Sequence, residues 1–162
     1  MAWSKEQLLA HLDALGITTE TTQHAAVFTV EEAKGVRGQS QGAHSKNLFL
    51  KDKKGPLFLV TVLEDRPIDL KELRHRIGAK NLSFGKPELL LAVLGLEPGS
   101  VSPFGVVNDT ENRVQVVIDA DMLRRPPLNF HPLTNTATTA IAPDGFLKFL
   151  EAAGHPPLIV EF

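Results

Sequence analysis

The chain has 162 residues, of which 43 % are hydrophobic and 22 % are charged, and its formal net charge is −2. This length suits one domain with a sizeable core, and the near-neutral charge excludes a global field that would attract nucleic acid. The sequence has no cysteine, which excludes disulfides, thiolate catalysis and sulfur-ligated zinc. No apolar run reaches the roughly 18 residues of a membrane helix, and the N-terminus lacks a signal-peptide pattern. We therefore expect a cytoplasmic protein with no membrane partner.

The N-terminal part of the chain carries clear helix and strand signals. A capping box of Ser4 and Gln7 predicts a helix that Gly16 ends. The threonine-rich stretch 18–24 that follows predicts a short strand. A second capping box at 29–32 predicts another short helix.

A hairpin is predicted in the next part of the chain. Residues 46–51 and 57–63 are apolar runs, and the stretch 52–55 between them has the composition of a turn. Both runs are almost continuously apolar, which is typical of central strands that are covered on both faces.

The remaining elements alternate irregularly. Asp69 predicts the N-cap of a helix that runs through Arg76, and Pro87 predicts the first turn of a helix that Gly95 ends. Strands are predicted at 106–107, 114–118, 128–131, 138–141 and 158–160, a helical turn at 119–123, an irregular stretch at 124–127, and a helix from 142 to about 153. This order differs from regular βαβ alternation. It predicts a single α+β (mixed α/β) domain over residues 1–162.

Polar residues at the start of the first hairpin strand indicate a functional site. Ser45, Lys46 and Asn47 stand at the start of an apolar strand, and the strand itself has no need of these polar side chains. A site that binds a phosphate and a hydroxyl would need them. We reject a serine–lysine dyad, because adjacent strand residues point to opposite faces. The same alternation separates Lys46 from Asn47. This difficulty disappears if Asn47 acts through its backbone, or if the strand is bulged or begins after it.

Two further segments carry candidate chemistry. His131 precedes Pro132, which restricts it to an extended conformation that suits a positioned imidazole, with a loop-capping histidine as the alternative. The loop 99–105 has glycines at both ends, which allows consecutive amides to point the same way, with an ordinary connection as the alternative. The histidines lack the spacing of helical metal ligands, so we expect no metal and no other cofactor.

Four segments together resemble the YbaK/ProX family of freestanding prolyl-tRNA editing domains, and within it the alanyl-tRNA(Pro) deacylase branch. They are residues 24–33, 46–50, 102–105 and 129–135. The resemblance runs from about residue 24 to the C-terminal strand. Many relatives have His-Pro where this chain has His24-Ala25, which affects rigidity there. The resemblance implies a compact fold with a curved mixed sheet surrounded by helices.

The resemblance also implies a reaction, the hydrolysis of an aminoacyl ester on the 3′-terminal adenosine of tRNA. Lys46 would hold the terminal phosphate or ribose, Asn47 would fix the ribose or the amino acid, and His131 would position substrate or water. Backbone amides near Gly105 would bind the carbonyl oxygen. The expected substrate-binding residues are Ser45, Ser102, Pro103, Phe104, Gly105, Phe130 and Thr138.

The expected partners are the acceptor end of aminoacyl-tRNA(Pro) and prolyl-tRNA synthetase. One alternative within the family is a deacylase for cysteinyl or seryl/threonyl esters on tRNA. Another is a domain that binds tRNA or another nucleic acid without hydrolysis. A third is a structural domain in which the polar residues are merely solvated.

Overall fold

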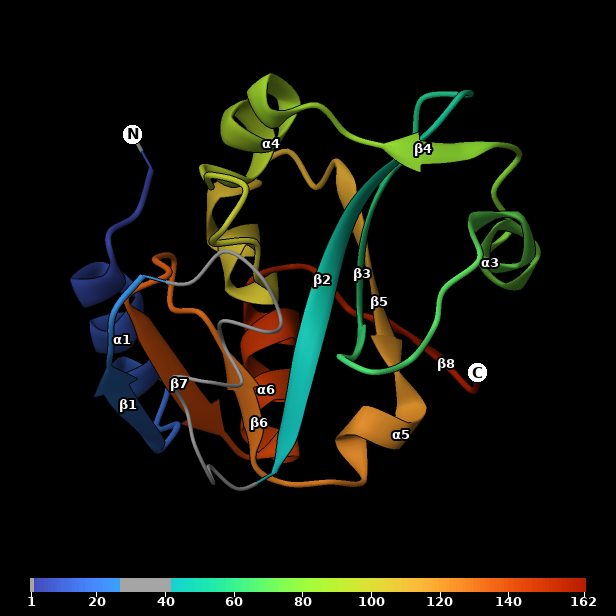
Figure 1. Ribbon diagram of the computed structural model, residues 1–162. Helices are drawn as coiled ribbons and strands as arrows, with labels where there is room; N and C mark the ends of the chain where they lie inside the picture. The colour runs from blue at the N-terminus through green and yellow to red at the C-terminus, as the bar shows by residue number, and fades with distance from the viewer. Residues whose placement is uncertain (1, 27–41) are drawn as a thin grey trace.

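The computed structural model describes residues 2–26 and 42–162, which form a mixed sheet with helices packed around it (Figure 1). The helices are α1 (Lys5–Ala14), α3 (Leu70–Ile77), α4 (Pro87–Leu94), α5 (Ala120–Leu123), α6 (Pro143–Ala152) and the 3-10 helix η1 (Pro103–Asn108). The strands are β1 (Thr19–Gln23), β2 (Ala43–Asp52), β3 (Leu57–Leu63), β4 (Leu82–Phe84), β5 (Val114–Asp119), β6 (Leu128–Phe130), β7 (Ala137–Ile141) and β8 (Leu158–Val160). Within the described ranges, none of the helices is long and apolar enough to cross a membrane.

The structure contains helix ends at the capping residues that the sequence predicts. Ser4 Oγ accepts from the N–H of Gln7 and the Gln7 side chain accepts from the N–H of Ser4, which completes the capping box of α1. Asp69 caps α3 by accepting from a backbone N–H of its first turn, and Gly95 ends α4 in the left-handed region. The capping box predicted at 29–32 lies outside the described residues.

The strands follow the order β1-β7-β6-β2-β3-β5-β8, with β4 paired to β2. The β2–β3 hairpin is antiparallel, whereas β2–β6, β3–β5 and β5–β8 are parallel, so the sheet is mixed. The predicted hairpin therefore lies at the centre of the sheet. The sequence did not predict β4, which is only three residues long.

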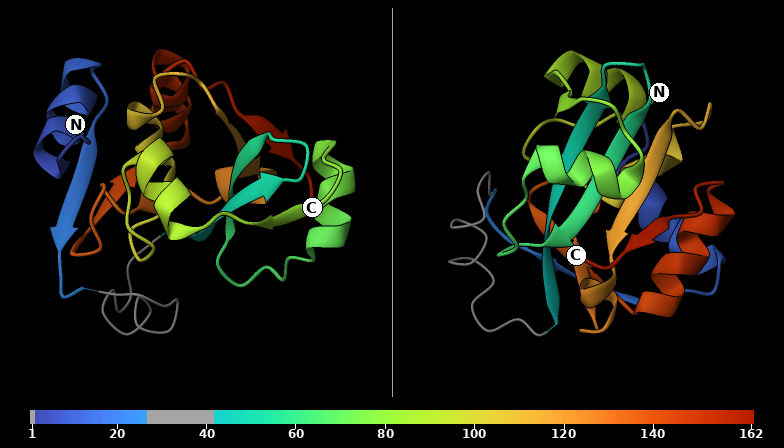
Figure 2. Two further views of the ribbon diagram at one scale, coloured as in Figure 1. Left: turned by 90° about the horizontal axis from the view of Figure 1, so that it is seen from above. Right: turned by 90° about the vertical axis from the view of Figure 1, so that its right-hand side faces the viewer.

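Buried clusters cover both faces of the hairpin, which explains its continuous apolar runs. Phe49 and Leu59 pack with α4 on one face, and Val60 and Val62 pack with Leu73 of α3 on the other. Figure 2 shows α3 over the strand face that is turned away from α6.

Residues 103–108 form η1, so the prediction of a loop to 105 followed by a strand at 106–107 is wrong. Phe104 is fully buried in the cluster that includes α1 and α6. Its ring packs edge-on against Phe130 and Phe149, with centroid distances of 5.7 and 5.3 Å. Packing of this ring decides the local conformation, and the segment's own sequence did not predict that contact.

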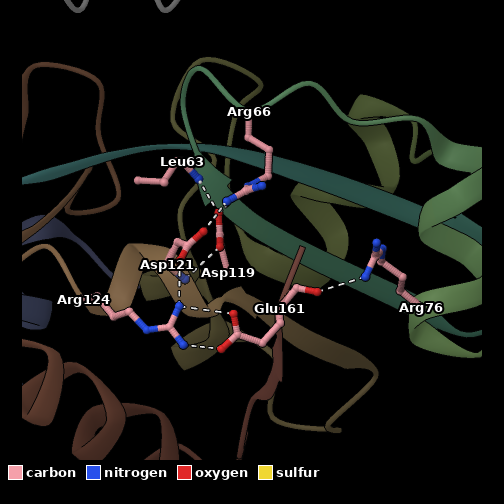
Figure 3. A network of polar contacts seen from close by, with 7 residues as sticks. All are labelled: Leu63, Arg66, Arg76, Asp119, Asp121, Arg124 and Glu161. Carbon is pink, nitrogen blue, oxygen red and sulfur yellow. Dashed lines mark hydrogen bonds and ion pairs between the residues drawn. The ribbon is translucent and has the colours of Figure 1, made fainter.

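Ion pairs join three segments that are far apart in the sequence (Figure 3). The Asp119 side chain, 0 % exposed, accepts from Arg66 at 2.8 Å and from a backbone N–H of β3 at 3.2 Å. Asp121 binds both Arg66 and Arg124, and Arg124 also binds Glu161. The hydrogen bond from Arg124, followed by that from Arg66, lowers the pKa of Asp121. The network fixes α5 and the C-terminal segment against β3.

Candidate functional site

The candidate site is a break in strand pairing along one edge of β2. This edge pairs with β6 only at Ala43 and His44, and with β4 only from Leu50 onward. Between these points, in the part of the chain that the structure describes, no strand pairs with this edge, and β2 and β6 diverge (Figure 1). Lys46 and Asn47 lie in this break.

Lys46 lies in β2 and His131 directly follows β6, so the two residues flank the break. His44 lies opposite Asn129 in the parallel β2–β6 pair, so Lys46 and His131 are each the second residue beyond that pair. Side chains alternate along a strand, and residues in register share a face. Lys46 therefore shares a face with His44, Asn129 and Ala140. The His131 ring lies on this face too, because its centroid is 6.2 Å from that of His24, which bonds to Thr138.

His131 is held in one tautomer. Its Nδ1 lies 3.0 Å from the carbonyl oxygen of Ala137. A carbonyl only accepts hydrogen bonds, so Nδ1 carries the proton and Nε2 of the neutral ring is an acceptor. Burial lowers the pKa of His131; the hydrogen bond to Ala137 opposes this effect, and the charge of His24 adds to it. The ring is therefore uncharged at neutral pH.

A second histidine, His24, lies beside this site, although the sequence alone gave it no chemical role. Its ring centroid is 6.2 Å from that of His131. Its Nδ1 donates to the carbonyl of Ala25 at 2.7 Å, and its Nε2 lies 2.8 Å from Thr138 Oγ1. The Thr138 hydroxyl and the His24 ring are therefore hydrogen-bonded partners. Among the described residues, no group of three metal-binding side chains is close enough to hold an ion.

Thr138 and His131 lie on the same face of the sheet. Phe130 lies opposite Thr139 in the antiparallel β6–β7 pair, which places His131 next to Thr138. The sequence could not show that His24 joins them, because this contact depends on the pairing of β1 with β7.

Ser45 and Asn47 project from the other face of β2. The β2–β3 register is continuous from Ser45–Leu63 onward, so the strand has no bulge at Asn47 and begins before it. Thr61 Oγ1 donates to Asn47 Oδ1 at 2.7 Å. Of the three ways of combining Lys46 with Asn47 in one site, only action through the Asn47 backbone fits this geometry.

Five of the expected substrate contacts are buried. They are Ser102, Pro103, Phe104, Gly105 and Phe130. The N–H of Phe104 donates to Ser102 Oγ at 3.1 Å, and the N–H of Gly105 donates to the Ser102 carbonyl at 3.0 Å. Both amides have partners inside the turn, so the expectation that they bind an oxyanion does not fit this structure. Phe130 belongs to the core because it alternates with His131.

Comparison with known proteins identifies the family. A family model described as "Aminoacyl-tRNA editing domain" matches residues 24–149. The chain belongs to the aminoacyl-tRNA editing domain family. The matched range contains His24, Lys46 and His131, and the inferred resemblance to the prolyl-tRNA editing family is confirmed at the level of the family.

Relatives of known sequence agree with this assignment. Prolyl-tRNA synthetase associated domain-containing protein 1 of Danio rerio is 41 % identical over 160 residues, covering 98 % of this chain and 87 % of the relative. Prolyl-tRNA editing protein ProX of Acetoanaerobium sticklandii is 37 % identical over 153 residues, covering 94 % of this chain and 93 % of the relative. A crystal structure described as a candidate trans-editing enzyme for prolyl-tRNA synthetase has a TM-score of 0.74, with 21 % identity and coverage of 99 % and 97 %. That structural match shows the shared mixed α/β fold.

Proposed function

We propose that this protein is a trans-editing deacylase that hydrolyses alanyl-tRNA(Pro) to alanine and tRNA(Pro). The main supporting observation is that Lys46 and His131 share one face beside a break in the sheet. Membership of the aminoacyl-tRNA editing family supports the reaction class. The relative named prolyl-tRNA editing protein ProX supports the choice of tRNA(Pro). The partner is the acceptor end of the charged tRNA, and prolyl-tRNA synthetase is the enzyme whose errors would be corrected.

In the proposed reaction, water attacks the carbonyl carbon of the aminoacyl ester. The water oxygen bonds to this carbon, and the carbonyl electron pair moves to the oxygen to form an oxyanion. The bond to the ribose 3′ oxygen then breaks, and this oxygen takes a proton with help from the neighbouring ribose hydroxyl. Alanine leaves as a carboxylate, and one proton is released overall. The aminoacyl ester is already activated, so no covalent nucleophile is needed.

Lys46 supplies the positive charge of the proposed site. Its side chain is partly buried. Among the residues that the structure describes, it forms no ion pair or hydrogen bond with another side chain. An ammonium group without an internal partner is available to hold the phosphate or ribose of the terminal adenosine, and such positioning accelerates the reaction.

His131 supplies an acceptor. Its Nε2 lone pair can accept a hydrogen bond from the attacking water or from a ribose hydroxyl, because Nδ1 is committed to Ala137. Burial keeps the ring uncharged, so the lone pair is present at neutral pH.

Selection for alanine follows from the limits of the synthetase. A pocket built for proline discriminates against a smaller side chain by only about 1–3 kcal/mol per methylene. A second site can select by size in the opposite direction, because a small pocket admits the alanine side chain and excludes the larger proline ring. Thr138 and Ala140 of β7 are small side chains on the same face as His131, and they are suited to line such a site.

A deacylation panel tests this function. Purified protein should release alanine from alanyl-tRNA(Pro) and leave prolyl-tRNA(Pro) intact. The panel also contains cysteinyl-, seryl- and threonyl-tRNA, which test the other substrates considered. Lys46→Ala should lower the rate about 10²-fold or more because the substrate is no longer positioned, with an unchanged circular dichroism spectrum. Lys51→Ala is the matched control, since Lys51 is an exposed lysine of the same strand.

The panel has clear contradicting outcomes. Binding of tRNA without hydrolysis by the wild-type protein would favour the nucleic-acid-binding alternative. Rapid release of cysteine, serine or threonine with slow release of alanine would show that the protein acts on a different mischarged tRNA, as the alternative within the family predicts. Equal rates for Lys46→Ala and wild type would remove Lys46 from the mechanism.

A further inference from the structure

The register of the hairpin fixes where the main-chain groups of β2 point. In an antiparallel pair, residues that bond to the partner strand alternate with residues whose N–H and C=O point away from it. The N–H of Glu64 donates to the carbonyl of His44 at 3.0 Å, and the N–H of Asp52 donates to the carbonyl of Pro56 at 2.8 Å. The even-numbered residues of β2 therefore bond to β3. The odd-numbered residues, including Asn47, direct their main-chain groups to the opposite edge.

Hydrogen bonds on either side of the break agree with this direction. The N–H of Ala43 donates to the carbonyl of Pro127 at 2.9 Å, and the carbonyl of Phe49 accepts from the N–H of Gly85 at 2.9 Å. Both odd-numbered residues thus bond to segments on the β6 and β4 side. Asn47 lies between them, where neither strand is paired, and in the described part of the chain its N–H has no hydrogen-bond partner.

We propose that the main-chain N–H of Asn47 donates a hydrogen bond to the carbonyl oxygen of the substrate ester and to the oxyanion that forms from it. This inference rests on the proposed hydrolysis. An unpaired strand edge binds a carbonyl as it would bind the backbone of an added strand. The donor is part of a rigid strand, so it needs no reorganisation when negative charge develops on the oxygen.

This assignment also explains how consecutive residues serve one site. A ligand in the plane of the sheet meets the edge of β2, so it contacts the Asn47 backbone and remains within reach of the Lys46 side chain on one face. His131, which continues β6 on the other side of the break, projects from the same face as Lys46. The Asn47 N–H takes the role that the sequence assigned to the amides near Gly105, which are already hydrogen-bonded.

An amide-to-ester replacement at Asn47 tests the proposal. Cell-free translation with the α-hydroxy analogue of asparagine exchanges the N–H for an oxygen and keeps the side chain. We expect kcat for alanyl-tRNA(Pro) to fall about 10²- to 10³-fold, as for the loss of one oxyanion donor, with little change in KM. The Tm should fall only slightly, because this N–H bonds to nothing inside the described protein and the exchange only weakens the carbonyl of Lys46 as an acceptor from β3.

The same replacement at Lys51 is the matched control. Lys51 is also an odd-numbered residue of β2, but its N–H faces β4 opposite Ser83. We expect this variant to lose Tm and to keep the wild-type kcat, which is the reverse of the pattern at Asn47.

Three results would overturn the inference. A wild-type kcat in the Asn47 ester variant of an active protein would refute the donor role alone. A fall in Tm at Asn47 as large as that at Lys51 would show that the N–H has a structural partner. A wild-type protein that hydrolyses no aminoacyl ester would refute the proposed function together with the inference.

Discussion

A single carbonyl group fixes the hydrogen-bonding polarity of His131. Because Nδ1 donates to Ala137, the other nitrogen is an acceptor, and burial favours the neutral ring. His24 has the same arrangement, with Nδ1 on the carbonyl of Ala25 and Nε2 on Thr138. Nε2 of His24 is thus occupied by Thr138, whereas Nε2 of His131 remains available on the face of the proposed site that also carries Lys46.

The lowered pKa of His131 predicts a pH-dependent stability. The ordinary histidine pKa is 6.5 and that of His131 is lower, so the unfolded chain binds the proton more tightly than the folded one. The stability is then at its full value above about pH 6.5 and decreases as the pH falls from there toward the folded-state pKa. His131→Gln removes this contribution. We expect the difference in free energy of unfolding, wild type minus variant, to decrease between about pH 7.5 and pH 5 in urea titrations. A difference that stays constant over this range would contradict the prediction.

At the scale of elements, β4 depends on a side chain of its neighbour. Gly85 follows β4, and its N–H donates to the carbonyl of Phe49 at 2.9 Å. A Cβ at Gly85 would lie 2.4 Å from two ring atoms of Phe49, so glycine is required for this close approach. The three residues of β4 are too few to give a strand pattern, and the contact that positions them comes from β2.

Gly85→Ala tests this dependence. We expect the substitution to lower the free energy of unfolding by about 1–3 kcal/mol, because the buried Phe49 ring must move. Chemical denaturation followed by tryptophan fluorescence measures the change. Ser83→Ala, at an exposed position of the same strand, should stay within about 0.5 kcal/mol of wild type. Equal stabilities of the two variants would contradict the packing argument.

At the scale of the whole molecule, charged groups connect segments that the strands leave separate. Asp119 ends β5, Arg66 follows β3, and Glu161 lies in the C-terminal segment, yet all three belong to one network (Figure 3). The network lies outside the break in β2 and consists of mutually paired charges. We therefore expect the network to stabilise the fold, and we do not include it in the proposed site.

Removal of the buried acid tests this assignment. Asp119→Ala should lower the free energy of unfolding by about 3 kcal/mol, because the partly buried Arg66 loses its carboxylate partner. Asp121→Ala should cause a smaller loss, since this side chain is 39 % exposed. Thermal and urea unfolding measure both. A loss for Asp121→Ala equal to that for Asp119→Ala would contradict the ranking by burial.

The sequence by itself determined the features that depend on neighbours along the chain. Cap residues such as Ser4 and Asp69, the turn at 52–55 and the apolar runs of the hairpin act locally, so their elements could be predicted. Lys46 and His131 could be proposed as site residues because Lys46 stands at the start of an apolar run, His131 precedes Pro132, and both lie in segments that resemble the family.

Only the tertiary structure decided the features that depend on strand register. The unpaired edge of β2, the contact of His24 with Thr138 and the pairing of β4 all depend on how strands far apart in the sequence align. The burial of Phe104 likewise depends on its contact with Phe130, which is distant in the sequence. A shift of one residue in any of these pairings would exchange the two faces of a strand. No local pattern encodes that choice, because it is made by the packing of the whole sheet against its helices.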